Sequence, residues 1–332
     1  MNSILVIRLT SLGDVILTTP VIRALKSAYP SAAIDVAVDA RYREVWHGNP
    51  HVRNIVTIEK GHENHTHGFT AYDLIVDLQR NRRSAAIIRS LSQSSNARVV
   101  RYKKHRIAKL AMVYLKRKPH ALSHIVQRYL EPLREIGILG DTGGLELWPL
   151  PSVDRSLGPV GNASRTRIGI APGAQHFTKR YPPELMAKVV RELVLTHGVE
   201  VVTLGGAAEV SLCDQIERES GVSVVRADGA TSLAETTALL DTLDCVISCD
   251  SALVHMSAAR GVPVAVIYGG TVPELGFTPY AVPHRVVESV GVLCRPCSHI
   301  GKSHCPKGHF RCMESILSES VTVSALGLLH SQ

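Results

Sequence analysis

Residues 3–14, which read SILVIRLTSLGD, contain the turn that decides the fold. Ser3–Leu9 is a short apolar run rich in β-branched residues, and Thr10–Asp14 interrupts it. A helical pattern then continues through Lys26, with Pro20 in its first turns, where proline is best tolerated. The stretch therefore predicts a strand, a turn and a helix, which is the repeating unit of a parallel α/β sheet.

The same alternation continues along both halves of the chain. In the first half, further strands are expected at 33–38, 55–58, 72–78 and 97–100, and an amphipathic stretch at 122–136. In the second half, strands are expected at 167–171, 200–204, 222–226, 245–249 and 264–268, with helices at 183–197, 208–219, 232–241 and 251–260. The chain looks irregular after Pro283, before a closing helix over 313–329.

The length of 332 residues favours about two domains. Residues 148–166 are rich in Pro, Gly, Ser and Asn and have no apolar period, which is typical of a linker. The predicted organisation is a Rossmann-like domain over 1–150, a linker over 151–166, a second Rossmann-like domain over 167–312 and a closing helix over 313–332.

Composition excludes several classes of protein. An apolar fraction of 45% with 20% charged residues excludes intrinsic disorder, and 5% aromatic residues disfavour a base-stacking nucleic-acid platform. No apolar run is long enough for a transmembrane helix, and Arg8 interrupts the opening apolar run too early for a secretory signal. Seven cysteines in a chain of this size do not indicate a disulfide scaffold.

The positive charge is concentrated in one segment. Between Asp77 and Glu131 the chain has 14 Lys and Arg residues and no acid, whereas the rest carries 23 bases and 29 acids. Within this basic block, residues 103–118 predict a basic amphipathic helix, able to lie on a membrane surface or cover an acidic ligand. The alternative is a solvated helix face, which normally mixes both signs of charge.

Polar residues at predicted strand ends are the candidate site residues, because ligands of open parallel sheets bind beyond the carboxyl ends of strands. In the first half these are Ser11, Gly13 and Asp14, where the alternative role for Asp14 is a helix N-cap. The segment lacks G-x-G-x-x-G, so it does not support a dinucleotide site or a nicotinamide-dependent dehydrogenase.

In the second half, Asp250–His255 directly follows an apolar strand, and the backbone N–H groups of this helix start could hold a diphosphate. Taken alone, His255 is equally well explained as a core histidine. Lys179 and Arg180 follow another strand end and could supply counter-charge to phosphates, or lie in a solvated loop.

Four cysteines near the C-terminus have spacing close to that of zinc sites, with three histidines among them: Cys294, Cys297, Cys305, Cys312, His299, His304 and His309. A loop of reduced cysteines is the alternative, and spacing does not decide between the two. His62, His65 and His67 form a polar loop that is not expected to bind metal.

Four sequence blocks, in order along both halves, carry a resemblance to a known family. The blocks are 7–20 (IRLTSLGDVILTTP), 72–79 (YDLIVDLQ), 172–174 with 179–182 (PGA, KRYP), and 249–256 (CDSALVHM) continuing to 261–263 (GVP) and 270–273 (GTVP). Cys312-Met313 in the Cys-rich tail is also similar. Together they resemble glycosyltransferase family 9, the ADP-heptose:lipopolysaccharide heptosyltransferases. Ala252 departs from the pattern, since many members have Gly there.

This resemblance implies an α/β GT-B fold, in which two facing Rossmann-like domains with parallel sheets enclose a cleft. It implies an inverting glycosyl transfer that needs no catalytic metal and no cofactor. The acceptor would bind the N-terminal domain and the nucleotide-sugar the C-terminal domain. Asp14 would be the general base.

The resemblance also implies the binding residues and partners. Donor-binding candidates are Lys179, Glu209, Asp250, Ser251, Ala252 and His255; acceptor-binding candidates are Ser11, Gly13, Asp77, Arg80, Lys103, Lys104 and Arg106. The expected partners are ADP-heptose or a related nucleotide-sugar, a phosphorylated Kdo-lipid A acceptor and the anionic inner-membrane surface, with no nucleic acid. The expected location is the cytoplasm, peripheral on the inner face of the cytoplasmic membrane.

Two alternatives stay open at this point. One is a family 9 transferase that uses another nucleotide-sugar and another envelope glycan. The other is a non-catalytic polyanion-binding protein on the same fold, for which loss of Asp14 would argue, and Asp14 is present.

Overall fold

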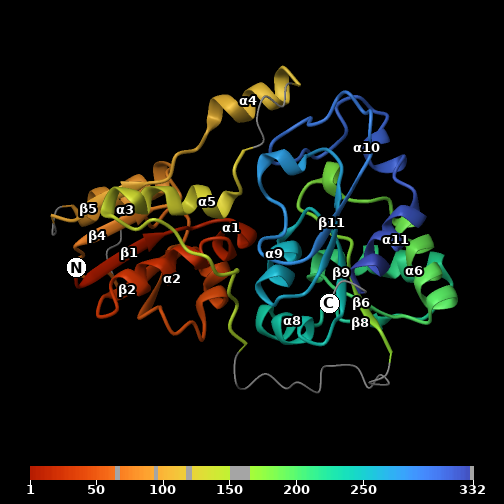
Figure 1. Ribbon diagram of the computed structural model, residues 1–332, viewed down its shortest axis with the longest axis horizontal. Helices are drawn as coiled ribbons and strands as arrows, with labels where there is room; N and C mark the ends of the chain where they lie inside the picture. The colour runs from red at the N-terminus through yellow and green to blue at the C-terminus, as the bar shows by residue number, and fades with distance from the viewer. Residues whose placement is uncertain (64–67, 93–95, 117–121, 150–164, 330–332) are drawn as a thin grey trace. The chain divides into compact units, whose positions relative to one another are not determined.

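The computed structural model describes residues 1–63, 68–92, 96–116, 122–149 and 165–329. It divides into two compact units (Figure 1). One comprises Met1–His105 and Ser123–Leu150, the other Arg106–Leu122 and Pro151–Gln332. This division differs from the predicted domain of 1–150, because residues 106–122 group with the second unit. The predicted linker, 151–166, lies outside the described residues except for its last two.

The first unit contains a five-stranded parallel sheet in the order β3-β2-β1-β4-β5 (Figure 1). The strands are β1 (Ser3–Ile7), β2 (Ala33–Val38), β3 (Asn54–Thr57), β4 (Leu74–Asp77) and β5 (Arg98–Arg101). The helices are α1 (Leu12–Ile16), α2 (Thr19–Ala28), α3 (Arg82–Leu91) and α5 (Ile125–Leu130), with 3₁₀ segments η1 (Ala40–Trp46) and η2 (Glu131–Ile136). All five strands predicted for this half are confirmed, with small differences at their ends.

The single helix predicted after the opening strand is wrong in one respect, because the structure has two helices. The Thr18 hydroxyl donates a hydrogen bond to the Val15 carbonyl oxygen at 2.6 Å, at the break between α1 and α2. Pro20 lies in the first turn of α2. Proline has no N–H to donate and is well accommodated at the start of a helix, so it favours a new helix here over continuation of the old one.

The second unit contains a six-stranded parallel sheet in the order β11-β10-β9-β6-β7-β8. The strands are β6 (Arg167–Ala171), β7 (Glu200–Thr203), β8 (Val225–Arg226), β9 (Cys245–Cys249), β10 (Val264–Tyr268) and β11 (His284–Glu288). The helices are α4 (Arg106–Tyr114), α6 (Pro183–His197), α7 (Val210–Ser220), α8 (Leu233–Leu240), α9 (Ala252–Ala259), α10 (Arg311–Glu314) and α11 (Ser318–Leu329). Three 3₁₀ segments complete it: η4 (Phe177–Lys179), η5 (Ala207–Glu209) and η6 (Pro273–Leu275).

Two predictions for the end of the chain need correction. The segment after Pro283, expected to be irregular, begins with β11, an edge strand whose first three residues are exposed and which therefore lacks a buried apolar pattern. The closing helix is two helices, α10 and α11. Val321, Ala325 and Leu328 of α11 are buried in the same apolar core as Met186 of α6, so the C-terminal helix is part of the second unit (Figure 1). None of the helices in the described ranges is long and apolar enough to cross a membrane.

Asp77 closes the turn that follows β4. Its Oδ1 accepts hydrogen bonds from the backbone N–H groups of Gln79 at 3.1 Å and Arg80 at 2.7 Å, and its Oδ2 accepts one from the Ser84 hydroxyl at 3.1 Å. The side chain is buried. A buried carboxylate with both oxygens engaged in this way fixes the path of the chain from β4 into α3.

We expect Asp77→Ala to loosen this turn. A buried donor left without an acceptor costs about 1–3 kcal/mol, so the melting temperature should fall and hydrogen exchange should speed up across 74–91. The matched control is Asp214→Ala, whose carboxylate is half exposed and pairs with Arg226, where a surface pair contributes about 0–1 kcal/mol. Wild-type exchange rates across 74–91 in Asp77→Ala would contradict this role.

Candidate active site

The predicted site residues follow the strands at which the strand order of each sheet reverses. In the first unit, β1 lies between β2 and β4, and Asp14 and Arg80 follow β1 and β4. In the second unit, β6 lies beside β9, and Lys179 and Asp250 follow these two strands. Crevices at such switch points are where open parallel sheets bind ligands. Each unit therefore carries one cluster of candidate residues at its own switch point.

Asp14 lies in α1, directly after the β1 turn, and its two carboxylate oxygens have different surroundings. Oδ2 accepts a charged hydrogen bond from Arg8 Nη2 at 2.7 Å and two from Ser11, from its hydroxyl at 3.1 Å and its N–H at 3.4 Å. Oδ1 accepts one from the Tyr129 hydroxyl at 2.8 Å. A carboxylate oxygen has two lone pairs, so Oδ1 keeps one for a further proton donor.

The surroundings of Asp14 favour its charged form. Burial opposes ionisation of the carboxyl, but the Arg8 guanidinium and the hydrogen bonds from Tyr129 and Ser11 outweigh it, so the pKa of Asp14 lies below its ordinary value. About 22% of the side chain is exposed, so a ligand in solvent can reach it. The predicted N-cap alternative is not the arrangement seen, because Ser11 is the N-cap of α1 and Asp14 is its third residue.

Two residues that hold Asp14 were not predicted as site residues. Tyr129 belongs to α5, 115 residues further along the chain, and the Arg8 guanidinium lies 5.2 Å from the centre of its ring. Tyr102 packs edge-on against Tyr129 with ring centres 5.0 Å apart. For Arg8 the sequence contains a signal of a site role, since this residue lies in the block 7–20 that resembles the family. Tyr129 had none, because nothing local distinguishes it from other apolar positions of an amphipathic stretch.

The acceptor candidates are divided between the two units. Asp77 is engaged in its turn, and Arg80 donates a hydrogen bond from Nη1 to the Tyr102 carbonyl oxygen at 2.9 Å. Lys103 and Lys104 follow β5 in the first unit, whereas Arg106 begins α4 in the second. The expectation that the basic block forms one surface of the N-terminal half therefore needs correction, because its helix packs with the other unit.

The donor candidates of the second unit include a buried ion pair. Lys179 Nζ lies 2.8 Å from Asp250 Oδ2, and the same oxygen accepts a hydrogen bond from the Thr271 hydroxyl at 2.7 Å. Lys179 ends η4, Asp250 follows β9, and Thr271 follows β10. Three strand-end loops thus fix one ammonium group, which has two further N–H donors to offer an anion. Thr271 was quoted in the block 270–273 but had no assigned role.

Glu209 is held by the glycine-rich loop after β7. Its Oε2 accepts a hydrogen bond from the Gly206 N–H at 3.0 Å. A Cβ atom on Gly173 would lie 2.3 Å from Glu209 Cγ, and one on Gly205 would lie 2.7 Å from Glu209 Cβ. Both glycines are therefore needed for the carboxylate to reach the end of the sheet, between the loops that follow β6 and β7.

The start of α9 has the geometry expected of a helix N-terminus at a strand end. Ser251 is its N-cap in an extended conformation, and Ala252 is its first residue. The Ser251 hydroxyl lies 3.3 Å from that of Ser248. His255 is buried one turn into the helix, as the alternative of a core histidine requires.

The four cysteines near the C-terminus are unpaired thiols. Burial raises the pKa of Cys312 to about 11 and also raises that of Cys297. Cys294 Sγ lies 3.7 Å from His309 Nε2. Among the residues that the structure describes, no three His, Cys, Asp or Glu side chains are arranged to hold a metal ion.

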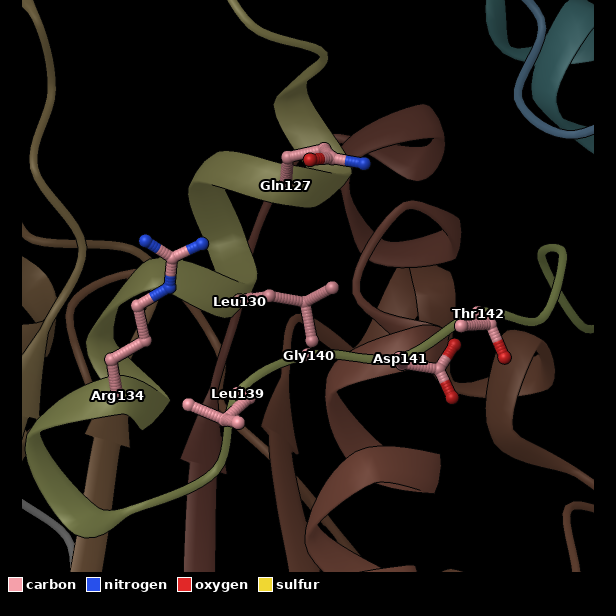
Figure 2. Close-up of a pocket in the computed structure, with 7 residues that line it drawn as sticks. All are labelled: Gln127, Leu130, Arg134, Leu139, Gly140, Asp141 and Thr142. Atoms are coloured by element: carbon pink, nitrogen blue, oxygen red, sulfur yellow. The ribbon is translucent and has the colours of Figure 1, made fainter.

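A surface pocket of about 430 Å³ lies elsewhere in the first unit (Figure 2). It is lined by Gln127, Leu130, Arg134, Leu139, Gly140, Asp141 and Thr142. Asp141 already forms an ion pair with Arg23 of α2. None of the predicted site residues lines this pocket, so we do not assign it to the candidate active site.

Comparison with known proteins identifies the family. The model of glycosyltransferase family 9 (heptosyltransferase) matches residues 68–307. The chain is 27% identical over 285 residues to lipopolysaccharide heptosyltransferase 3 of Escherichia coli (strain K12), an alignment that covers 78% of this chain and 80% of that protein. It is 26% identical over 304 residues to lipopolysaccharide heptosyltransferase 2 of Salmonella typhimurium, covering 83% and 84%.

Two solved structures share the fold. The family 9 glycosyl transferase of Veillonella parvula superposes with a TM-score of 0.81 at 20% identity, covering all of this chain and 98% of that one. The E. coli ADP-heptose lps heptosyltransferase II gives a TM-score of 0.71 at 22% identity, covering 100% and 99%. With a family match over most of its length and two parallel-sheet units of the GT-B type, the chain belongs to glycosyltransferase family 9, the heptosyltransferases.

Proposed function

We propose that this glycosyltransferase transfers a heptose from ADP-heptose to the phosphorylated Kdo-lipid A inner core of lipopolysaccharide, with inversion at the anomeric carbon. The observation that carries the proposal is the environment of Asp14, a carboxylate whose charged form is favoured, whose Oδ2 is held by Arg8 and Ser11, and whose Oδ1 keeps a lone pair beside the Tyr129 hydrogen bond. The relatives described above are lipopolysaccharide heptosyltransferases, and one of them is named for ADP-heptose. The acceptor would bind the first unit and the donor the second.

In this mechanism Asp14 is the general base. An acceptor hydroxyl oxygen attacks the anomeric carbon, the bond from that carbon to the diphosphate oxygen breaks, and ADP leaves with the electron pair. The hydroxyl proton passes to Asp14 Oδ1, the oxygen that accepts only the Tyr129 hydrogen bond among the described contacts. Arg8 and Ser11 hold Oδ2 and so keep the carboxylate from rotating.

The leaving diphosphate gains negative charge as the bond breaks, and fixed donors stabilise it most. Lys179 is the proposed cation, and Asp250 with Thr271 positions it. Backbone N–H groups at the α9 start, after Ser251, would add donors without adding charge. Glu209 is proposed to bind donor hydroxyl groups, since a carboxylate accepts hydrogen bonds and repels phosphate.

The basic block supports a polyanionic, membrane-borne acceptor. Lys103 is exposed after β5, and the segment from 78 to 130 has no acidic residue. Each base near an anionic membrane contributes about 1 kcal/mol, screened beyond about 8–10 Å at physiological salt. We therefore propose that the enzyme works in the cytoplasm, as a peripheral protein on the inner face of the cytoplasmic membrane.

The first test is Asp14→Asn, which keeps the shape of the side chain and removes its basicity. Turnover of ADP-heptose with a defined Kdo-lipid A acceptor, followed by product mass, should fall by about 10²–10⁴-fold. The control is Asp73→Asn, an exposed carboxylate at the opposite edge of the same sheet. Near-normal turnover in a folded Asp14→Asn protein would overturn the assignment. Turnover seen only with other nucleotide-sugars would favour the alternative of a family 9 transferase that uses another donor.

The second test is the pH dependence of Tyr129→Phe. The Tyr129 hydroxyl donates a hydrogen bond to the Asp14 carboxylate and lowers its pKa, so its loss raises that pKa. The base must be ionised to act, so activity is lost as the pH drops through the pKa of Asp14. In Tyr129→Phe this loss should occur at a higher pH than in the wild type. A profile of kcat/KM against pH measures the shift. An acid limb at the wild-type position would exclude this role for Tyr129.

The third test concerns the donor. Lys179→Met removes the proposed diphosphate cation and keeps the length of the stem, and a charge-assisted hydrogen bond contributes about 1.5–3 kcal/mol. Calorimetry should show ADP binding weakened by about 10–150-fold. Lys188→Met, an exposed lysine on α6, is the control and should bind ADP as the wild type does. Equal ADP affinity in the two variants would contradict the role of Lys179.

A further inference from the structure

Helix α4 has two apolar faces, and among the residues that the structure describes only one of these faces is covered. Met112 is buried in a cluster with Val272 and Leu275, which attaches the helix to the segment after β10. Ile107 is 85% exposed and Tyr114 is 76% exposed. These two residues, with Leu110 between them, recur at the spacing that places side chains on one side of a helix.

A second exposed apolar segment lies beside the end of this helix. Lys116 Nζ donates hydrogen bonds to the carbonyl oxygens of Cys294 at 3.0 Å and Pro296 at 2.6 Å. This contact brings the end of α4 against the loop that follows β11 (Figure 1). Leu293, the neighbour of Cys294, is 88% exposed. The loop and the helix both belong to the second unit.

The positive charge of this surface comes mainly from the helix segment. The helix lies in the basic block, which has no acid between Asp77 and Glu131. The loop lies in a stretch, 289–313, that has no acid and four Lys and Arg residues, of which the one inside the loop, Arg295, forms an ion pair with Glu288 at 2.6 Å. Exposed Lys302 is among them. Two acid-free segments, far apart in the sequence, therefore meet at one exposed apolar surface.

We propose that α4 and the 289–300 loop form a single lipid-binding surface, with Ile107, Leu110, Tyr114, Leu115 and Leu293 entering the interface of an anionic bilayer. Exposed aliphatic and aromatic side chains beside bases, with no acid, are the features of a surface that inserts shallowly among anionic headgroups. A protein partner would need acidic groups across this surface and an apolar pocket for each side chain. An anionic bilayer supplies negative headgroups across the whole surface, and its fluid apolar region accommodates each side chain without a preformed pocket.

This inference deepens the proposed function and rests on it, because the proposed lipid-borne acceptor is what brings the enzyme to a membrane. It adds that the contact is made by the unit that carries the donor candidates, and that it is partly hydrophobic. A purely electrostatic contact through Lys103 and Lys104 would weaken steeply with salt. Insertion of the apolar side chains predicts binding that persists in part when salt screens the charges.

The test is co-sedimentation of the full chain with vesicles of phosphatidylglycerol and phosphatidylethanolamine, and with vesicles of phosphatidylcholine. The wild type should bind the anionic vesicles more tightly than the neutral ones. The combined variant Ile107→Ser, Leu110→Ser, Leu293→Ser should bind anionic vesicles at least tenfold more weakly, because burial of one such side chain is worth about tenfold in affinity. The melting temperature should not change, since all three side chains are exposed.

The matched control is Leu195→Ser, Leu317→Ser, Val323→Ser, which removes three other exposed apolar side chains of the same unit. It should bind vesicles as the wild type does. Wild-type protein that stays in the supernatant with anionic vesicles, or equal affinity of the two triple variants, would overturn the proposal. So would unchanged vesicle binding with a lower melting temperature or an altered oligomeric mass in the α4 variant, because the face would then be covered by protein.

A second measurement separates this proposal from the proposed function. Turnover with a lipid-free, water-soluble acceptor fragment should be unchanged in the α4 variant, since none of its three substitutions is a candidate site residue. Lost vesicle binding with retained turnover supports both proposals. Vesicle binding by a wild type that transfers no heptose would leave the lipid surface in place and exclude the proposed reaction.

Discussion

Parallel pairing of the strands is the constraint on which both sites depend. Parallel neighbours cannot be joined by a tight turn, so each strand is followed by a crossover that starts at the carboxyl edge of the sheet. All strand pairs in both sheets are parallel. Loops distant in the sequence therefore begin side by side. Gln79 shows the effect, since its Oε1 accepts a hydrogen bond from the Leu9 N–H at 3.0 Å and joins the loops after β4 and β1.

The charged candidate side chains at these edges are largely buried and lie in ion pairs, with 22% of Asp14 and 17% of Lys179 exposed. A buried ion is stable only with a partner and further hydrogen bonds. Asp14 has Arg8, Tyr129 and Ser11, and Lys179 has Asp250. Asp14 and Lys179 are thus each held by protein groups and keep hydrogen-bonding capacity for a ligand. In the proposed mechanism an acceptor hydroxyl or a donor phosphate would join a network that is already oriented, which would limit the reorganisation needed during the reaction.

Much of the fold could be predicted from sequence, because apolar runs and strand-end glycines are local signals. The strands of the first unit, the family blocks and Asp14 were all found in this way. Three features could not be found. β11 is an exposed edge strand without an apolar run, and Tyr129 reaches Asp14 across 115 residues through tertiary packing alone. The packing of α4 in the second unit comes from tertiary contacts, the burial of Met112 against Val272 and Leu275 and the hydrogen bonds of Lys116, which no periodicity reveals.

The course of the chain around α4 has a consequence for the modularity of the protein. The backbone passes between the two units at 105–106, at 122–123 and at 150–151. Neither unit is a continuous piece of sequence, so a single cut does not release a complete domain. A fragment that ends at residue 150 would keep α4 without Val272 and Leu275, the residues that cover Met112. Recombination that exchanges one half for that of a relative would separate this helix from its packing partners. We therefore expect the two units of this enzyme to have been inherited together rather than as interchangeable parts.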